Sequence, residues 1–320
     1  MISTEISLAA ELLRQNEVIG LPTETVYGLA GNIFSEEAVK KIFRIKQRPF
    51  YNPLIVHIGS MDQLSLVARN IPPMAEALAK AFWPGPLTLL LEKQPSIPDL
   101  ITAGKPTVAL RMPDHPMALA LLNSIEFPLA APSANPFGSI SPTTARHVED
   151  YFKGQVPLVL DGGPCKKGVE STIIGFSNGE AILYRHGAIP MEEISRITGP
   201  LKIHNREEQT PDAPGMLSKH YSPRTPTILS TDLAATLGEY GAKKAALLLF
   251  DKKRTDHDPA MQWVLSPSSS MEEAAANLYA MLHLIDEQQA DLIICEKMKE
   301  EGLGITINDR LTRASIESLV

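Results

Sequence analysis

Two neighbouring stretches decide the fold: KQRPFYNPLIVH, residues 46–57, and LPTETVYGL, residues 21–29. The first runs from a helix that is stopped by Pro49 to a strand that begins near Pro53. It carries two permanent cations, an amide and an imidazole: Lys46, Arg48, Asn52 and His57. A loop with this content is typical of a cradle for a polyanion.

The segments on either side alternate between helix and strand patterns. Ser35 as N-cap, with Glu36 and Glu37 in the first turn, predicts the helix over 35–46. Similar signals predict the other elements: helices over 4–15, 73–82 and 115–124, and strands over 18–21, 53–58, 87–92, 107–112, 157–161, 169–176 and 181–188. This alternation predicts an α/β fold for residues 1–203, with a large mixed twisted sheet.

The strand expected over 107–112 predicts which side chains share one face of the sheet. Its period of two places Thr107, Ala109 and Arg111 on one face, so the two polar side chains can face one site about 13 Å long.

The Pro- and Gly-rich loop AAPSANPFGSISPTTA, residues 130–145, adds more polar groups. Ser133 and Asn135 lie in it, and Ser141 with Pro142 is expected to provide the N-cap and first-turn proline of the next helix.

The second half of the chain divides into a connector and a smaller unit. Residues 204–226 are poor in aliphatic side chains and carry several prolines, which predicts a linker. Residues 227–320 contain the strand-like runs TPTILS, KKAALLLFD, QWVLS and DLIICE, with helices expected over 232–240, 270–288 and 305–316. We therefore expect a Rossmann-like α/β domain with parallel strands.

Composition narrows the function classes. A chain of 320 residues with 44% apolar and 21% charged residues fits two globular domains, and a net charge of −7 does not favour bulk electrostatic binding of nucleic acid. Cys165 and Cys295 are far apart, so a thiolate zinc site and a disulfide framework are not expected. The acidic start of the chain and the lack of a long apolar run predict a cytoplasmic protein without a membrane segment.

The common catalytic motifs are missing from the sequence. No Walker loop, GxGxxG, HExxH or GxSxG occurs, so covalent and zinc catalysis are not expected and no metal ligand is assigned. Taken singly, the polar residues also have ordinary explanations. Lys46 and Arg48 can complement a helix dipole, His57 can be a core histidine, and Ser133 and Asn135 can be turn formers.

Taken together, six ordered motifs resemble the YrdC/TsaC family of threonylcarbamoyl-AMP synthases. They are LPTETVYGL, KQRP with NPLIVHI, TVALRMP, APSANPFG with SPT, GVESTI and LYRHG, and they include the family's K-x-R and S-x-N signatures. PGMLSKHYSP and GITINDRLTRA resemble the longer, two-domain branch. The resemblance implies a concave cleft in the first domain. It also implies synthesis of threonylcarbamoyl-adenylate and pyrophosphate from L-threonine, bicarbonate or CO2, and ATP.

The resemblance also assigns roles residue by residue. Lys46 and Arg48 are expected to act on the phosphates as catalytic residues. The nucleotide would be bound by Arg48, Asn52, Thr107, Ser133, Asn135, Ser141, Arg185 and Tyr221. Threonine would be bound by Thr25, His57, Arg111, Ala131 and Ser171, and Mg2+ would be carried by the ATP phosphates.

The implied product modifies the adenosine next to the anticodon of tRNAs that read codons beginning with A. We expect it to pass to a tRNA threonylcarbamoyl-transferase complex, with weak RNA binding by this chain. The linker reads MLSKHYSP where a more basic lead-in is expected, and its turns and Tyr221 suggest a lid over residues 206–224 that protects a labile anhydride.

Two alternatives belong to other classes. A carbamoyl-adenylate enzyme of hydrogenase maturation shares the first domain, but it needs cysteine-rich zinc fingers that two cysteines cannot supply. A non-enzymatic RNA-binding module would use the same basic cleft to recognise duplex shape.

Overall fold

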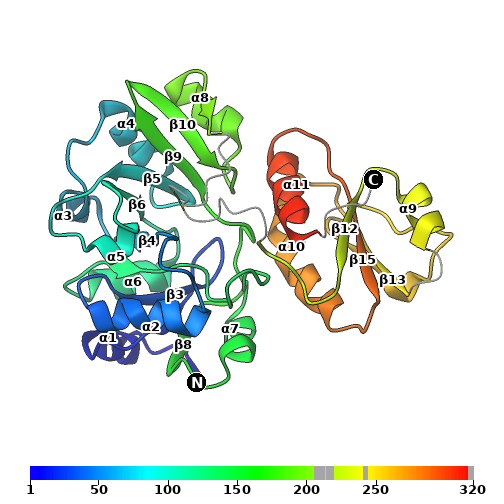
Figure 1. Ribbon diagram of the computed structural model, residues 1–320, viewed down its shortest axis with the longest axis horizontal. Coiled ribbons are helices and arrows are strands. Elements are labelled where there is room, and N and C mark those ends of the chain that lie inside the picture. The colour runs from blue at the N-terminus through cyan, green and yellow to red at the C-terminus, as the bar shows by residue number, and fades with distance from the viewer. Residues whose placement is uncertain (205–212, 214–219, 241–243, 316–320) are drawn as a thin grey trace.

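Two sheets covered by helices organise the chain, which the computed structural model describes over residues 1–204, 213, 220–240 and 244–315 (Figure 1). The larger sheet has eleven strands and the smaller has four. In spatial order the larger consists of β1 (Ile2–Ser3), β8 (Leu158–Leu160), β2 (Ile19–Leu21), β3 (Gly28–Asn32), β7 (Leu129–Ala130), β4 (Ile55–His57), β6 (Thr107–Arg111), β5 (Leu87–Glu92), β9 (Thr172–Ser177), β10 (Glu180–Arg185) and β11 (Lys202–Ile203).

The larger sheet is mixed, as the sequence predicted. Strands β4 and β6 are parallel, whereas β2 with β3, β5 with β6 and β9 with β10 are antiparallel. Its helices are α1 (Ile6–Arg14), α2 (Glu36–Lys46), α3 (Leu64–Val67), α4 (Pro73–Phe82), α5 (Asp99–Thr102), α6 (Pro116–Asn123), α7 (Ala145–Phe152) and α8 (Met191–Thr198), with a 3-10 turn η1 (Met61–Gln63). The α/β class predicted from the alternation of patterns is confirmed.

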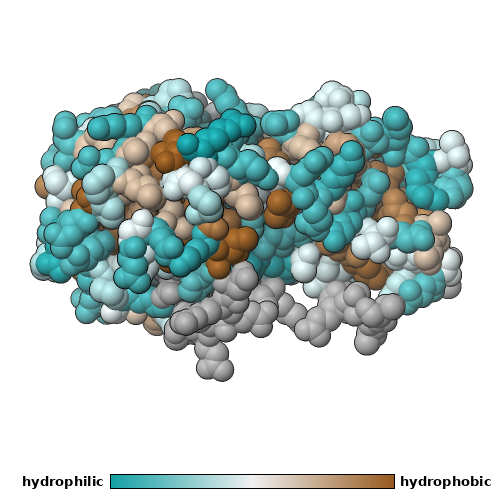
Figure 2. Space-filling view, turned by 90° about the horizontal axis from the view of Figure 1, so that it is seen from above, coloured by the Kyte–Doolittle hydropathy of each residue, from teal (hydrophilic) through white to brown (hydrophobic). Residues whose placement is uncertain are grey.

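Two apolar clusters hold these helices to the sheet. One joins α1 and α6 to the strands through residues such as Leu13, Leu121 and Leu158. The other packs residues of α2, α4 and α7 against the central strands, with Phe43 and Phe152 among its largest side chains. Figure 2 shows one face of the molecule, where hydrophobic side chains occur in small groups among hydrophilic ones.

The smaller sheet has only parallel strands, as expected for residues 227–320. Its order is β12 (Thr227–Ser230), β15 (Leu292–Glu296), β13 (Ala245–Leu249) and β14 (Gln262–Val264), with helices α9 (Leu233–Tyr240), α10 (Met271–Asp286) and α11 (Leu303–Ala314) and a 3-10 turn η2 (Pro259–Met261). Figure 1 shows α10 and α11 on the side that faces the larger unit. Val26, Val169 and Tyr221 share a buried cluster with residues of these two helices.

The helix after the Pro- and Gly-rich loop begins later than the sequence predicts. Helix α7 starts at Ala145, and its N-cap is Thr144, whose side chain accepts a hydrogen bond from the His147 N–H. The hydroxyl of Ser141 instead donates to Oε1 of Glu170 at 2.6 Å. The prediction of Ser141 as N-cap was wrong, because a hydrogen bond to a buried carboxylate is stronger than a bond to a neutral helix end.

Within the described residues, no helix is both long and apolar enough to span a membrane. The lid predicted over residues 206–224 falls mostly outside the described residues, since 205–212 and 214–219 are not among them.

The two units approach each other closely at Gly168. Its φ is +67°, and a Cβ built there would lie 2.2 Å from the carbonyl oxygen of Ala276 in α10. Gly163 has a similar φ of +79°, but a Cβ there would meet nothing within 4 Å. We expect Gly168→Ala to destabilise the protein by about 1–3 kcal/mol more than Gly163→Ala, which carries a similar backbone cost. Equal melting temperatures of the two variants would contradict this contact.

The same interface contains a stacked pair of histidines. The rings of His147 and His283 lie 3.9 Å apart, and Nε2 of His283 donates to the carbonyl of Ser141 at 3.2 Å. Burial, with the nearby His147, lowers the pKa of His283 from 6.5 to about 4. Between pH 6.5 and 4 the unfolded chain therefore binds a proton at His283 that the folded chain does not bind. The contribution of His283 to stability is full above pH 6.5 and is lost as the pH falls toward 4.

We expect this histidine to contribute up to about 2 kcal/mol of the stability lost between pH 6.5 and 5. His283→Gln keeps an N–H donor but cannot titrate, so its stability should fall less over that range. Urea denaturation at several pH values measures the difference, and parallel pH profiles of the variant and the wild type would disprove it.

Candidate active site

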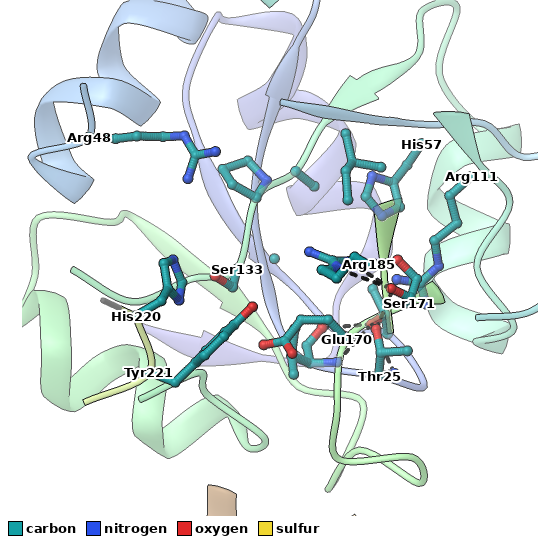
Figure 3. A pocket seen from close by; sticks show the side chains of 16 residues that line it. Thr25, Arg48, His57, Arg111, Ser133, Glu170, Ser171, Arg185, His220 and Tyr221 are labelled. Carbon is teal, nitrogen blue, oxygen red and sulfur yellow. Dashed lines mark hydrogen bonds between the residues drawn. The ribbon is translucent and has the colours of Figure 1, made fainter. Parts of the chain in front are cut away.

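A cleft lies in the larger unit where loops next to several strands converge, and two residues of the segment predicted as the linker, His220 and Tyr221, line it on one side (Figure 3). Its lining residues are Thr23, Thr25, Val26, Gly28, Arg48, Ile55, His57, Arg111, Ala131, Pro132, Ser133, Glu170, Ser171, Arg185, His220 and Tyr221. Figure 3 shows Arg48, His220 and Tyr221 toward one side and Thr25, His57 and Arg111 toward the other.

Arg48 brings a fixed positive charge to the cleft. Helix α2 ends at Lys46, and Gln47 caps it in the left-handed conformation with φ 54° just before Arg48. The Nη2 of Arg48 donates to Oδ1 of Asn52 at 2.6 Å and to the carbonyl of Pro53 at 2.8 Å. Burial lowers the pKa of Arg48 to about 9. Asn52 is not a lining residue, so its observed part is to orient the guanidinium.

Lys46 is also buried, but it does not line the cleft. Its Nζ donates to the carbonyl oxygens of Ser133 and Asn135, both at 2.5 Å. The amide of Asn135 in turn donates to the carbonyls of Pro136 and Ser139. Burial lowers the pKa of Lys46 well below its usual value. In this structure Lys46 and Asn135 shape the loop that places Ser133 in the cleft.

A second arginine reaches the cleft from the end of β10. Nη2 of Arg185 donates to the carbonyl of Ser171 at 2.9 Å and to its hydroxyl at 3.0 Å. The same hydroxyl lies 2.7 Å from the hydroxyl of Thr88 on β5. Strands β5, β9 and β10 are neighbours in the sheet, so their pairing sets the position of both Arg185 and Ser171.

The opposite side of the cleft combines an arginine with neutral hydrogen-bonding groups. His57 and Arg111 are register partners at the carboxyl ends of the parallel strands β4 and β6. Nη1 of Arg111 donates to the hydroxyl of Thr25 at 2.9 Å, and its Nη2 lies 2.6 Å from a carboxylate oxygen of Glu24. Burial, and then Arg111, lowers the pKa of His57 to about 3, so the ring is neutral at physiological pH.

Several buried polar atoms of the lining have no hydrogen-bond partner among the described residues. They are Nδ1 of His57, Nδ1 of His220 and the hydroxyl of Tyr221. Buried polar groups are normally satisfied, so these atoms are free to bond to a ligand or to water in the cleft. Tyr221 has a φ of 66°, and its ring is held between His220, at 4.1 Å, and Tyr279, at 5.8 Å between centroids.

The cleft does not include every residue that the sequence nominated. Those that do not line it are Lys46, Asn52, Thr107, Asn135 and Ser141. Thr107 starts β6 and pairs with Glu92, four residues before Arg111 on the same face. The remaining nominated residues line the cleft together: Thr25, Arg48, His57, Arg111, Ala131, Ser133, Ser171, Arg185 and Tyr221.

Sequence reasoning missed three polar lining residues, Thr23, Glu170 and His220. Glu170 lies inside the motif GVESTI, where a carboxylate at the entry to a buried strand was a usable signal. It is 6% exposed and lies between the two sides of the cleft (Figure 3). Within the described part of the chain, no group of three or more His, Cys, Asp and Glu side chains is arranged to hold a metal ion.

Comparisons with known proteins agree with this architecture. Residues 11–187 match the Sua5/YciO/YrdC family model, described as "Telomere recombination", and residues 189–315 match the model described as "Threonylcarbamoyl-AMP synthase, C-terminal domain". The threonylcarbamoyl-AMP synthase of Pyrococcus abyssi is 41% identical over 97% of this chain and 94% of its own length, and that of Bacillus subtilis is 40% identical over 97% and 93%.

A solved structure extends the agreement to three dimensions. The crystal structure of P. abyssi Sua5 complexed with L-threonine superposes with a TM-score of 0.90 at 41% identity, covering 97% of this chain and 94% of that one. The named homologues are enzymes. Both units of the fold, and nearly all of the sequence, are thus accounted for, and the chain belongs to the Sua5/YciO/YrdC family, in the two-domain branch that carries the threonylcarbamoyl-AMP synthase C-terminal domain.

Proposed function

We propose that this chain is an L-threonylcarbamoyladenylate synthase, a nucleotidyltransferase that uses L-threonine, bicarbonate or CO2, and ATP and releases pyrophosphate. The observation that carries the proposal is the division of one buried cleft into two chemically different sides. Arg48 lies on one side, next to Tyr221, whereas Thr25, His57 and Arg111 form the other. The crystal structure of a 41% identical relative with L-threonine supports the choice of amino acid.

The proposed reaction requires the protein to position the substrates and to stabilise charge, and it requires no nucleophilic side chain. The threonine amine and CO2 form a carbamate, whose oxygen attacks the α-phosphorus of ATP. The bond from that phosphorus to the oxygen bridging to the β-phosphate breaks, and pyrophosphate leaves with the electron pair. The charge that develops on the phosphates would be met by Arg48 and Arg185, and the buried cleft would exclude the water that hydrolyses the mixed anhydride.

Each side of the cleft would contribute differently. Arg111 would receive the threonine carboxylate, because its planar guanidinium offers parallel N–H donors, and the neutral ring of His57 would accept or donate a hydrogen bond. The unpartnered hydroxyl of Tyr221 and the hydroxyl of Ser133 would contact the nucleotide. Mg2+ would be held mainly by the ATP phosphates and would neutralise their charge.

Three residues that do not line the cleft would act indirectly, by orienting residues that do. Asn52 fixes Arg48, and Lys46 and Asn135 fix the loop of Ser133. We propose that the product serves tRNA modification next to the anticodon, in the cytoplasm, and passes to a transferase complex. The cations of the cleft are buried, which favours a small ligand over an RNA duplex as its occupant.

The direct test is to incubate the purified chain with ATP, threonine and bicarbonate and to measure pyrophosphate. Release that requires all three substrates is the expected result. Release no greater than in a reaction without threonine would refute the proposal, and RNA binding in its place would favour the alternative of an RNA-binding module.

We expect Arg48→Ala to lower turnover about 30- to 1000-fold, or about 2–4 kcal/mol, because a charge-assisted contact to a phosphate is lost. Arg48→Lys should recover only part of the activity, since a single ammonium nitrogen cannot replace both Nε, which donates to the Asn52 carbonyl, and Nη2, which donates to Oδ1 of Asn52 and to the Pro53 carbonyl. Arg44→Ala, in the exposed last turn of the same helix, is the control and should be fully active. A folded Arg48→Ala variant with wild-type turnover would contradict the role.

We expect Arg111→Ala to raise the KM for threonine and to leave the KM for ATP unchanged. Because this change also leaves Glu24 without its buried cation, Arg111→Lys is the matched variant that keeps the charge. Serine, which lacks one methyl group, should be a poorer substrate by only about 1–3 kcal/mol. A change in the KM for ATP alone would mean that Arg111 serves the other ligand.

A further inference from the structure

One carboxylate in the cleft is bound by both units of the fold. Oε1 of Glu170 accepts a hydrogen bond from the Ser141 hydroxyl at 2.6 Å, within the larger unit. Its Oε2 accepts from the hydroxyl of Tyr279 in α10 at 2.9 Å and from Nε of Arg310 in α11 at 2.8 Å. The smaller unit therefore donates two hydrogen bonds to a carboxylate in the wall of the cleft.

Arg310 is held so that it cannot turn away from this contact. Its side chain is 1% exposed, and Nη2 donates to the carbonyl of His186 in the larger unit at 2.7 Å. Its Nη1 contacts Asp309 on its own helix. The guanidinium also lies over the ring of Tyr221, 5.0 Å from its centroid. One arginine thus contacts both Glu170 and Tyr221, which line the cleft.

The charge of Glu170 matters because of what the cleft is proposed to bind. Burial by itself raises the pKa of Glu170, but the charge of Arg310, and then that of Arg185, brings it down to about 2. The side chain is therefore ionised at physiological pH. A carboxylate that faces a triphosphate repels it, and the repulsion is strong where water is excluded. The ion pair between Glu170 and Arg310 offsets that repulsion.

We propose that Arg310, with Tyr279, is a positioning residue for nucleotide binding, through which the C-terminal unit neutralises Glu170 and sets the ring of Tyr221. This inference rests on the proposed function and assigns the C-terminal unit a part in it. It concerns ATP rather than threonine, since ATP carries several negative charges and threonine is a zwitterion with almost none. Arg310 touches neither substrate and acts only through Glu170 and Tyr221.

Calorimetric titration of the full chain with ATP and Mg2+, without threonine, tests the inference. Arg310→Gln leaves Glu170 as an unpaired carboxylate in the cleft, and we expect it to weaken ATP binding about 10-fold or more. Threonine binding should change less than about 2-fold, because a zwitterion with almost no net charge is repelled far less by an uncompensated carboxylate than a triphosphate is. Arg313→Gln removes the same charge from the same helix without touching Glu170, and it should bind ATP as the wild type does.

A second variant separates this electrostatic part from a purely structural one. Glu170→Gln combined with Arg310→Gln removes both charges, so ATP affinity should return to within about 3-fold of the wild type if repulsion is the cause. A misfolded C-terminal unit would not be rescued in this way.

Three outcomes overturn the inference: unchanged ATP affinity in Arg310→Gln, equal losses for ATP and threonine, or a double variant as weak as the single one. Each is read from binding alone, so it is independent of threonine-dependent pyrophosphate release, which tests the proposed function. A wild-type chain that binds no ATP would overturn both.

Discussion

Several cations are buried in or beside one cleft, and their burial constrains the structure around them. A buried charge is costly unless it is paired or hydrogen-bonded, and the chain meets this cost in two ways. Lys46 and Arg48 donate to carbonyl and amide oxygens, and within the described residues neither pairs with a carboxylate. Arg111 and Arg310 instead face Glu24 and Glu170. The charges of Arg111 and Arg310 are thus balanced by carboxylates, whereas Arg48, which lines the cleft, keeps its charge for an anionic ligand.

Strand pairing in the larger sheet brings the polar residues of the cleft together. Parallel pairing of β4 and β6 brings His57 and Arg111 to the same edge, and the neighbouring strands β9 and β10 bring Ser171 and Arg185 to it. Arg48 follows directly after α2, where Gln47 caps the helix in a left-handed conformation. No single element carries the site, so the fold must be complete before the cleft exists. This fits a chemistry that relies on positioning.

The two units are joined by more than a connecting segment. A continuous apolar cluster crosses between them, Gly168 lets the backbone of α10 approach closely, and the ion pair of Glu170 with Arg310 lies at the wall of the cleft. Apolar contact supplies most of the association, whereas the ion pair fixes one geometry. The smaller unit can therefore affect the cleft without contributing a lining residue of its own from α10 or α11.

The sequence predicted most of the longer helices and strands and their α/β order, and the family resemblance nominated nine of the residues that line the cleft. Helix caps and strand periodicity are local signals, so Ser35 correctly marked the start of α2, and the strand expected over 107–112 is present as β6. Only the tertiary structure decided what each polar group contacts. Ser141 reads locally as an N-cap, but its partner is Glu170, and the partner of Glu170 is Arg310, 140 positions further along the chain. Such a choice depends on burial and on a charge brought near by folding, neither of which a local pattern contains.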